Sequence, residues 1–309
     1  MKVVYMGTPD FAVPPVETLY NEGFDIPLVI TQKDRPRGRG KKLQPTAVKK
    51  KAIELGLEVY QPDNINSSES VEVLEKIAPD VIVVTAYGQI LKREILSMPK
   101  YGCINIHASL LPKYRGAAPI NWAIINGEEK TGITIMEMEE GLDSGPMLLQ
   151  SSIEIKEDDD AQKIHDRLSY LGSRAIIQVL REISEGSIKK QLQDDSKATY
   201  ASKITKDLGK IDWEDRGKDI KNMIRGLKPW PSAYTDYEGK SMKIHNADVI
   251  DKFIKGENGK VVKVSKDGIY VNCSDNCIVV KEIQMPGKRK LSVDEYLRGN
   301  KFKSDIILS

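Results

Sequence analysis

Three polar side chains in the first half of the sequence have types and spacing suited to chemistry at a carbonyl carbon. Asn105 and His107 lie two residues apart in an apolar run, so a strand would place both on one face. Asp143 lies in a glycine-flanked turn after a second apolar run. An amide donor and an imidazolium would stabilise an oxyanion, while the carboxylate helps to remove a proton from an attacking amine. The three side chains therefore suit attack of an amine on a carbonyl group.

A structural role remains open for each of these residues. A histidine in a core strand is most often a hydrogen-bonded structural residue, and a turn aspartate commonly binds its own backbone. An asparagine on the same strand face as His107 favours function. The sequence marks no Ser or Cys as a nucleophile, which favours direct transfer over a covalent intermediate. The turn at residues 7–12 lacks the G-x-G-x-x-G spacing, so NAD binding is not expected.

The elements that must position these side chains alternate between strand and helix over residues 1–190. Apolar, β-branched runs predict strands at 2–6, 26–30, 57–60, 81–84, 103–107, 131–138 and 148–155. Helical spacing predicts helices at 11–22, 45–54, 68–77 and 161–185. Strands separated by helices favour a parallel sheet covered on both faces. Ligands bind at the carboxyl ends of such strands, which is where Asn105 and His107 lie.

The second half of the chain has a different pattern. The polar segment 186–206 has no sustained period and predicts a linker. A helix near 217–226 is followed by period-two runs, which predict strands at 233–237, 242–249, 260–264, 269–273 and 278–285. Short strands joined by tight turns favour a small barrel or sandwich. We therefore expect one domain at 1–189, a linker at 190–206 and a second domain at 207–309.

Charge is distributed unevenly, although 47 Lys and Arg against 45 Asp and Glu give a net charge of only +2. Six of the ten residues at 33–42 are basic, and the Gly and Pro residues between them are expected to keep this segment out of helix and strand. Residues 137–143 and 154–160 are acidic. A second basic cluster consists of Lys281, Lys288, Arg289, Lys290, Arg298, Lys301 and Lys303. A solvated surface explains any single charged run, but a basic loop favours a polyanionic partner.

The composition of the 309 residues excludes several classes of protein. Hydrophobic residues make up 40% and charged residues 30%, with a mean hydropathy of -0.40, which is typical of a water-soluble globular chain. No apolar run approaches the roughly 18 residues of a membrane span, and the first run is too short for a signal peptide. Three cysteines cannot form a disulfide framework or a complete zinc site. A cytoplasmic protein without a metal is expected.

Longer motifs surround the candidate residues. The sequence contains Asn105-Ile106-His107-x-Ser109-Leu110-Leu111-Pro112 and, downstream, Gly141-Leu142-Asp143-Ser144-Gly145. These motifs resemble those of the formyltransferases that use 10-formyltetrahydrofolate. Further motifs resemble the branch of that family that formylates methionyl-tRNA, and they lie at 6–12, 31–42, 86–91, 200–205, 211–213 and 229–235. The resemblance therefore covers nearly the whole chain, in both expected domains.

The resemblance implies an α/β fold: a Rossmann-like parallel-sheet formyltransferase domain followed by a small C-terminal OB-like β-barrel domain. It implies catalytic roles for Asn105, His107 and Asp143. The residues implied in binding the folate co-substrate are Ser109, Leu110, Leu111, Pro112, Tyr87, Gln89, Ile90 and Leu91. The residues implied in tRNA binding are Lys33, Arg35, Arg37, Arg39, Lys41, Lys42, Lys288, Arg289 and Lys290. The implied co-substrate is 10-formyltetrahydrofolate, without a metal, and the implied partner is initiator methionyl-tRNA, bound by a monomer.

Two other functions remain open. The first is a formyltransferase with another amine acceptor, such as glycinamide ribonucleotide or a nucleotide-linked amino sugar. The purine enzyme has no counterpart of residues 207–309, and the sugar enzymes have little use for the basic segment 33–42. The second is a non-enzymatic OB-type nucleic-acid-binding protein, which would leave Asn105, His107 and Asp143 unexplained.

Overall fold

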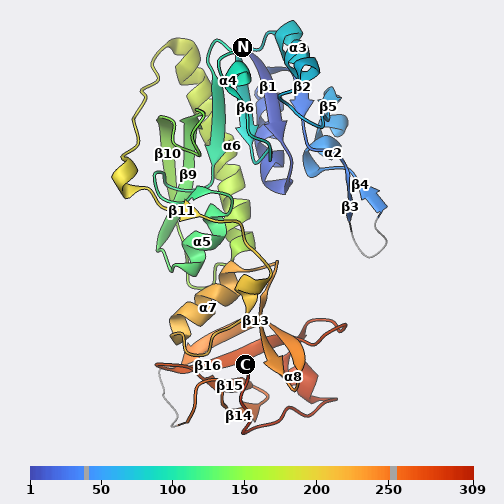
Figure 1. Cartoon of the computed structure of the whole chain (residues 1–309), viewed down its shortest axis with the longest axis vertical. Helices are drawn as coiled ribbons and strands as arrows, with labels where there is room; N and C mark the ends of the chain where they lie inside the picture. Colours follow the sequence, from blue (N-terminus) through green and yellow to red (C-terminus); the bar gives the residue numbers. More distant parts are fainter. Residues whose placement is uncertain (38–41, 251–255) are drawn as a thin grey trace. The chain divides into compact units, whose positions relative to one another are not determined.

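A computed structural model of the chain describes residues 1–37, 42–250 and 256–309 (Figure 1). The described residues form two compact units. The N-terminal unit comprises Met1–Pro119, Lys130–Glu154 and His165–Ala201. The C-terminal unit comprises Ile120–Glu129, Ile155–Ile164 and Ser202–Ser309, so it includes two short segments from the first half of the sequence.

A seven-stranded sheet forms the centre of the N-terminal unit. Its strands are β1 (Lys2–Gly7), β2 (Asp25–Ile30), β5 (Val59–Tyr60), β6 (Val81–Thr85), β7 (Cys103–His107), β9 (Lys130–Glu137) and β10 (Met147–Glu154). The strand order is β10-β9-β7-β6-β1-β2-β5. The strands from β7 to β5 in this order are parallel, whereas β9 is antiparallel to both β7 and β10. The predicted parallel sheet is confirmed, with one reversed strand beside β7.

Helices cover both faces of this sheet, as the alternating pattern predicts. They are η1 (Asp10–Ala12), α1 (Val13–Asn21), α2 (Ala47–Glu54), α3 (Ser68–Ile77), α4 (Arg93–Leu96) and α6 (Ala161–Glu185). Leu74 of α3 and Ile95 of α4 pack in one apolar cluster with Ile82 of β6. On the other face, α6 approaches β7 so closely that a Cβ at Gly172 would lie 2.7 Å from Ile106 Cγ2. The two faces of β7 therefore meet different helices.

The described parts of the basic segment contribute to the two strands of a β3–β4 hairpin, contrary to the expectation that Gly and Pro keep the segment out of regular structure. Strands β3 (Arg35–Arg37) and β4 (Lys42–Gln44) pair antiparallel, with Pro36 opposite Leu43. Proline is tolerated in a two-stranded ribbon because each strand is an edge strand, with one side of its backbone free of ladder hydrogen bonds. The sequence pattern therefore misassigned the two arms of this segment.

The C-terminal unit contains an antiparallel sheet consistent with a small barrel. Its strands are β12 (Ala233–Tyr237), β13 (Lys240–Ile250), β14 (Val261–Ser265), β15 (Gly268–Asn272), β16 (Cys277–Gln284) and β17 (Leu291–Ser292). The order is β12-β13-β16-β15-β14, with β17 beside β16. Residues 305–309 form hydrogen bonds with both edge strands of this sheet. The Val261 N–H of β14 donates to the Ile306 carbonyl (2.8 Å), and the Asp236 N–H of β12 donates to the Ser309 carbonyl (2.6 Å). The end of the chain thus bridges the two edge strands.

Four further short elements belong largely to the C-terminal unit: α5 (Pro119–Ile125), η3 (Asp207–Gly209), α7 (Gly217–Gly226) and α8 (Val293–Leu297). Helix α5 joins this unit by packing against α7. The Asn121 side-chain amide donates to the Gly226 carbonyl at 2.7 Å, and a Cβ at Gly226 would lie 2.7 Å from Ile125 Cγ1. A glycine at the end of α7 is therefore what permits this close approach.

The connector (residues 190–201) contains regular structure that its polar composition does not predict. It includes η2 (Asp195–Lys197) and β11 (Tyr200–Ala201), and β11 pairs in parallel with β8 (Arg115–Gly116). Pairs of two residues form through backbone groups alone, so they leave no side-chain period in the sequence. Among the described residues, no helix is both long enough and apolar enough to cross a membrane.

Candidate active site

The carboxyl end of β7 carries two of the predicted catalytic residues. Asn105 and His107 alternate with Ile104 and Ile106, so they share the face of β7 on which Cys103 joins the α3–α4 cluster. His107 is buried, with 6% exposure, whereas Asn105 is partly exposed. One face of β7 therefore carries a buried imidazole and a partly exposed amide, although the other residues of the strand are apolar.

Both ring nitrogens of His107 face oxygen atoms. Nε2 lies 2.9 Å from the Tyr114 carbonyl oxygen, and Nδ1 lies 3.6 Å from Asp143 Oδ2. A carbonyl oxygen can only accept, so Nε2 must carry a proton. Nδ1 is therefore the ring nitrogen that can form a hydrogen bond with Asp143 or with a substrate.

Asp143 is held in the turn between β9 and β10. Its Oδ2 accepts a hydrogen bond from the Gly116 N–H at 2.8 Å, which fixes the carboxylate on the side of His107. Asp143 and Tyr114 both have left-handed backbone conformations, with φ of 48° and 61°. Such conformations are unfavourable for non-glycine residues and are concentrated at functional sites. The two residues that contact the His107 ring are thus both in strained conformations.

The loop that follows β7, residues 108–113, is fixed by side chains on the neighbouring strands. Thr134 Oγ1 accepts from the Leu111 N–H (3.1 Å) and donates to the Ser109 carbonyl (2.7 Å). Gln150 on β10 donates to the Leu111 carbonyl (2.8 Å) and to Thr134 Oγ1 (3.0 Å). Ser109 Oγ in turn donates to the Lys113 carbonyl. The predicted folate-binding segment Ser109, Leu110, Leu111 and Pro112 therefore lies in a loop held by residues that sequence reasoning missed.

Thr134 has one signal in the sequence that could have drawn attention to it. It is a polar residue in the apolar run Ile133–Thr134–Ile135, and the structure places it directly opposite His107 in the β7–β9 pairing. Its hydroxyl is buried. The antiparallel register, which local spacing does not reveal, is what brings Thr134 to the site.

The second predicted folate segment has its side chains in different environments. Tyr87 and Leu91 are buried in the apolar cluster of β1, β6 and α3. Gln89 holds the loop at residues 63–65, accepting from the Ile65 N–H and donating to the Asp63 carbonyl. Ile90 is 82% exposed. The structure thus separates these four side chains, and Ile90 is the one available to a ligand as an apolar surface.

The Tyr87 hydroxyl is a buried polar group with no hydrogen-bond partner in the part of the chain that the structure describes. Burial raises the pKa of this phenol above its ordinary value. A buried hydroxyl without a partner carries a desolvation cost. It would gain a partner from a polar ligand atom that reached it.

The residues predicted to bind tRNA lie in two separate places. Lys33 pairs with Asp63 at 2.6 Å, and Arg35 is exposed on β3. Arg37 and Lys42 lie on β3 and β4, whereas Arg39 and Lys41 fall outside the described residues. In the C-terminal unit lie Lys288, Arg289 and Lys290.

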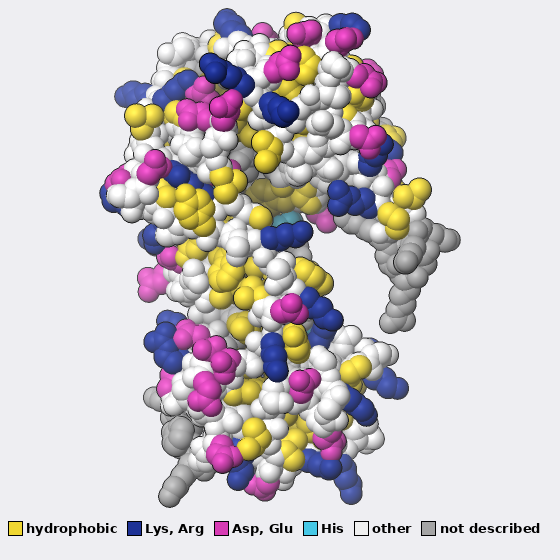
Figure 2. Space-filling view, viewed as in Figure 1, with side chains coloured by type: hydrophobic (Ala, Val, Ile, Leu, Met, Phe, Trp, Pro, Cys, Tyr) yellow, Lys and Arg dark blue, Asp and Glu magenta, His cyan; other side chains and the backbone are white. Residues whose placement is uncertain are grey.

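Two of the three residues of the C-terminal unit that are predicted to bind tRNA have acidic neighbours. Arg289 Nη2 lies 4.0 Å from Glu295 Oε1 and Lys290 Nζ lies 3.2 Å from Glu282 Oε2. Figure 2 shows basic and acidic side chains interspersed over the visible face of both units. The charge available to a polyanion is therefore smaller than the count of basic residues indicates.

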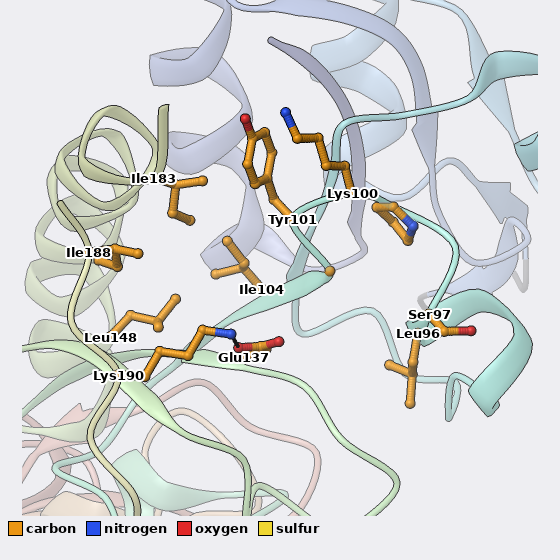
Figure 3. Close-up of a pocket in the computed structure, with 12 residues that line it drawn as sticks. Leu96, Ser97, Lys100, Tyr101, Ile104, Glu137, Leu148, Ile183, Ile188 and Lys190 are labelled. Carbon is orange, nitrogen blue, oxygen red and sulfur yellow. Dashed lines mark ion pairs between the residues drawn. The ribbon is translucent and has the colours of Figure 1, made fainter. Parts of the chain in front are cut away.

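A pocket of about 370 Å³ is lined by residues at the amino end of β7, including Gly102 and Ile104, whereas His107 is the last residue of that strand. Figure 3 shows the side chains that line this pocket. Its lining includes Ile104, Leu148 and Ile183, together with the ion pair between Lys190 and Glu137. Glu137 is paired with Ile104 at the amino end of β7. This pocket therefore does not contain the predicted catalytic residues. Among the described residues, no group of three or more His, Cys, Asp or Glu side chains is arranged to hold a metal ion.

Comparison with known proteins defines the class of this site. A formyl transferase family model matches residues 1–180, and a model of the formyl transferase C-terminal domain matches residues 203–301. The chain therefore belongs to the formyl transferase family. Among the relatives that match along the whole chain, methionyl-tRNA formyltransferase of Caldanaerobacter subterraneus subsp. tengcongensis is 51% identical, and that of Clostridium acetobutylicum is 50% identical. The matches cover 100% of this chain and 100% and 99% of the relatives. This identity places the chain among the methionyl-tRNA formyltransferases.

Solved structures share the fold at much lower identity. The sugar 3N-formyl transferase WlaRD, solved in the presence of dTDP and 5-N-formyl-THF, has a TM-score of 0.69 at 21% identity. That match covers 94% of this chain and 99% of WlaRD. HypX from Aquifex aeolicus, in complex with tetrahydrofolic acid, has a TM-score of 0.63 at 18% identity, covering 96% of this chain and 47% of HypX. These likenesses confirm the two-domain fold.

Proposed function

We propose that the protein transfers the formyl group of 10-formyltetrahydrofolate to the free α-amine of methionyl initiator tRNA. The products are N-formylmethionyl-tRNA and tetrahydrofolate, and the role is in translation initiation. Full-length identity of about 50% to methionyl-tRNA formyltransferases supports the acceptor. The observation that carries the chemistry is the contact of the His107 ring with Asp143 at the carboxyl end of β7, next to Asn105.

The reaction requires one bond to form and one to break at the formyl carbon. The amine nitrogen attacks this carbon, and the carbonyl electron pair moves to the oxygen, which becomes an oxyanion. The side-chain amide of Asn105 and the Nδ1–H of a His107 imidazolium, whose Nε2–H donates to the Tyr114 carbonyl, are the two donors for this oxyanion. Collapse of the tetrahedral intermediate breaks the bond to N10 of the folate, which takes up a proton.

Asp143 accepts the proton that the amine loses. Its Oδ2 faces both His107 Nδ1 at 3.6 Å and the Gly116 N–H at 2.8 Å, so one carboxylate oxygen is fixed while the other remains for the amine. This division favours a carboxylate that acts as a base without moving. Because the Tyr114 carbonyl occupies Nε2, the imidazole can only act through Nδ1.

The folate co-substrate and the tRNA would be held by separate groups. The loop with Ser109, Leu110, Leu111 and Pro112 is preorganised by Thr134 and Gln150. Ile90 offers an exposed apolar surface to the pterin ring, and the Tyr87 hydroxyl lacks a partner among the described residues. The β3–β4 hairpin and the basic residues at 288–290 would bind tRNA phosphates, since sequence-independent affinity for nucleic acids comes from such contacts.

The location of this reaction is the cytoplasm, where charged tRNA and folate are both present. The three cysteines support this location, because all three are free and buried in the structure.

The test is a formylation assay with 10-formyltetrahydrofolate and four acceptors. Initiator methionyl-tRNA is the expected substrate. Elongator methionyl-tRNA, free methionine and a nucleotide-linked amino sugar are the comparisons. The expected result is rapid formylation of the initiator tRNA alone. Formylation of the amino sugar without formylation of the tRNA would assign the protein to a different acceptor class. Nucleic-acid binding without formylation of any acceptor would favour a non-enzymatic role.

A further inference from the structure

One side chain of the connector reaches the turn that carries Asp143. The Gln193 side-chain amide donates to two carbonyl oxygens of this turn, those of Asp143 and Gly145, each at 2.8 Å. Both protons of one NH2 group thus have acceptors, 50 and 48 residues away in the sequence. The polar composition of the connector, which predicts a plain linker, does not reveal this contact.

Arg115 fixes the orientation of Gln193. Its Nε and Nη2 donate to Gln193 Oε1 at 3.1 and 2.8 Å, and Nη2 also donates to Asp195 Oδ1 at 2.7 Å. A guanidinium can only donate, so the amide oxygen must face Arg115 and the NH2 group must face the turn. The Arg115 side chain is only 4% exposed, which makes the loss of its acceptor costly. Arg115 therefore holds the oxygen of the Gln193 amide, and the two turn carbonyls hold its NH2 group.

Two features of Asp143 itself bear on how firmly this turn must be held. Its φ of 48° is unfavourable for a residue with a side chain, and the carboxylate has the Gly116 N–H as its short contact. Gly116 directly follows Arg115, so Arg115 and Gly116 fix the turn at two points, one through Gln193 and one through the carboxylate. Loss of the Gln193 donors would free the two carbonyls and let the backbone at Asp143 relax.

We infer that Gln193 is a positioning residue for the formyl transfer: it holds the Asp143 turn through two hydrogen bonds and so keeps the carboxylate opposite His107. This inference rests on the proposed function, in which Asp143 accepts the amine proton. Gln193 does not touch the reacting atoms. It acts by fixing the backbone from which the Asp143 side chain projects.

The connector is anchored elsewhere as well, so the loss of Gln193 is expected to leave the fold intact. Gln191 and Met147 exchange two backbone hydrogen bonds, of 2.8 and 2.9 Å. Thr199 Oγ1 accepts from the Tyr114 N–H, and the Thr199 carbonyl accepts from the Arg115 N–H. These contacts do not use the Gln193 side chain.

The decisive variant is Gln193→Glu. The new carboxylate still accepts from Arg115 but cannot donate to the two carbonyls. Gln191→Glu is the matched control, because the Gln191 side chain is exposed and the substitution adds the same charge two residues away. Gln193→Ala, which removes both interactions, is a second variant in case the introduced charge perturbs folding.

The first measurement is steady-state formylation of initiator methionyl-tRNA. We expect kcat of Gln193→Glu to fall by about 10-fold to 10²-fold, since small misplacements of a catalytic group have effects of this size. The KM for tRNA should stay within about twofold. In an Asp143→Asn background the same substitution should cost much less, because residues that act as a unit are not additive. An unchanged kcat, or an equal loss in both backgrounds, would overturn the inference.

The second measurement does not depend on activity. Amide hydrogen exchange at residues 141–145 and at Gly116 should be faster in Gln193→Glu than in the wild-type protein and unchanged in Gln191→Glu. Equal exchange in all three proteins would overturn the inference. A wild-type protein that forms no N-formylmethionyl-tRNA would refute the proposed function instead, and the exchange result would still decide whether Gln193 holds the turn.

Discussion

His107 Nδ1 lies 3.6 Å from Asp143 Oδ2, beyond the length of a strong hydrogen bond. The same carboxylate oxygen lies 2.8 Å from the Gly116 N–H, and the other ring nitrogen lies 2.9 Å from the Tyr114 carbonyl. Each side chain is therefore oriented by backbone groups rather than by the other. The longer contact leaves Nδ1 free to turn its hydrogen bond toward a substrate atom, and catalytic hydrogen bonds often tighten only when the substrate binds.

Replacement of Asp143 by Asn should remove the proton acceptor of the reaction but keep the conformation of the turn. In Asp143→Asn, the amide oxygen can still accept from the Gly116 N–H, so the turn should keep its conformation. The amide cannot accept the amine proton, and kcat for formylation should fall by at least about 10²-fold. Single-turnover formylation and thermal unfolding are the two measurements. A variant that formylates at the wild-type rate would remove Asp143 from the mechanism.

Thr134 should matter for both stability and use of the formyl donor. Thr134→Val keeps the shape but leaves the Leu111 N–H and the Ser109 carbonyl without the hydroxyl, at a cost of about 1–3 kcal/mol for buried groups. The KM for 10-formyltetrahydrofolate should rise because the loop that follows β7 is less ordered. Thr131→Val on the same strand is the control, since Thr131 is buried but is not among the described residues that hydrogen-bond to this loop. Denaturant unfolding and donor titration check both effects, and equal behaviour of the two variants would contradict this account.

The structure also shows which features local sequence patterns can predict. Helices at 68–77 and 161–185 and the strand at 103–107 have the predicted bounds, because long apolar periods record burial directly. Strands β3, β4, β8 and β11 were missed because two or three residues that pair through backbone groups have no period. Asn105 and His107 could be found because they share one strand.

The supporting residues could not be found in the same way. Thr134 reaches the site through an antiparallel register, and Gln193 reaches it across 50 residues of sequence. Neither relationship is present in local spacing. Polar residues in a segment without a period are assigned to solvent by default, and Gln193 shows where that default fails.

Asp34 should stabilise the base of the β3–β4 hairpin in a pH-dependent way. Hydrogen bonds from Lys49 and then from Gln61 hold the pKa of this carboxyl below its usual value. A depressed pKa stabilises the folded state above about pH 4, and this stabilisation is lost as the pH falls through the folded-state pKa. Asp34→Asn should therefore cost about 0.5–1 kcal/mol at pH 7, with a smaller difference below pH 4. Thermal unfolding from pH 3 to 8 measures the difference. Asp63→Asn, at an 85% exposed side chain, should show almost none.

Lys288 should contribute more to tRNA binding than Lys290. Within the described residues Lys288 has no ion pair, whereas Lys290 Nζ lies 3.2 Å from Glu282 Oε2. A free ammonium that binds a phosphate releases a counterion, so Lys288→Ala should reduce the slope of log KM for tRNA against log salt by about one. Lys290→Ala should change it less, because Glu282 already neutralises much of that charge. Formylation kinetics from 50 to 200 mM salt compare the two variants, and the reverse order would contradict the assignment.

Gly145 should be the least replaceable residue of the Asp143 turn. A Cβ at this position would lie 2.0 Å from the Glu137 carbonyl oxygen, which belongs to the backbone of β9 and cannot move without disturbing the sheet. At Gly141 a Cβ would lie 2.1 Å from Ser144 Oγ, the end of a side chain that can rotate away.

Gly145→Ala should therefore shift the turn and cost about 1–3 kcal/mol of stability. Formylation kcat should fall by at least about tenfold, because the Gly145 carbonyl is one of the two acceptors for Gln193 and Asp143 lies two residues away. Gly141→Ala should have a smaller effect, and Ser144→Ala should relieve it in the double variant. Thermal unfolding measures the change in stability, and formylation assays on the same preparations measure the change in kcat. If Gly145→Ala kept the wild-type kcat, the turn could not be the rigid support that holds the Asp143 carboxylate opposite His107.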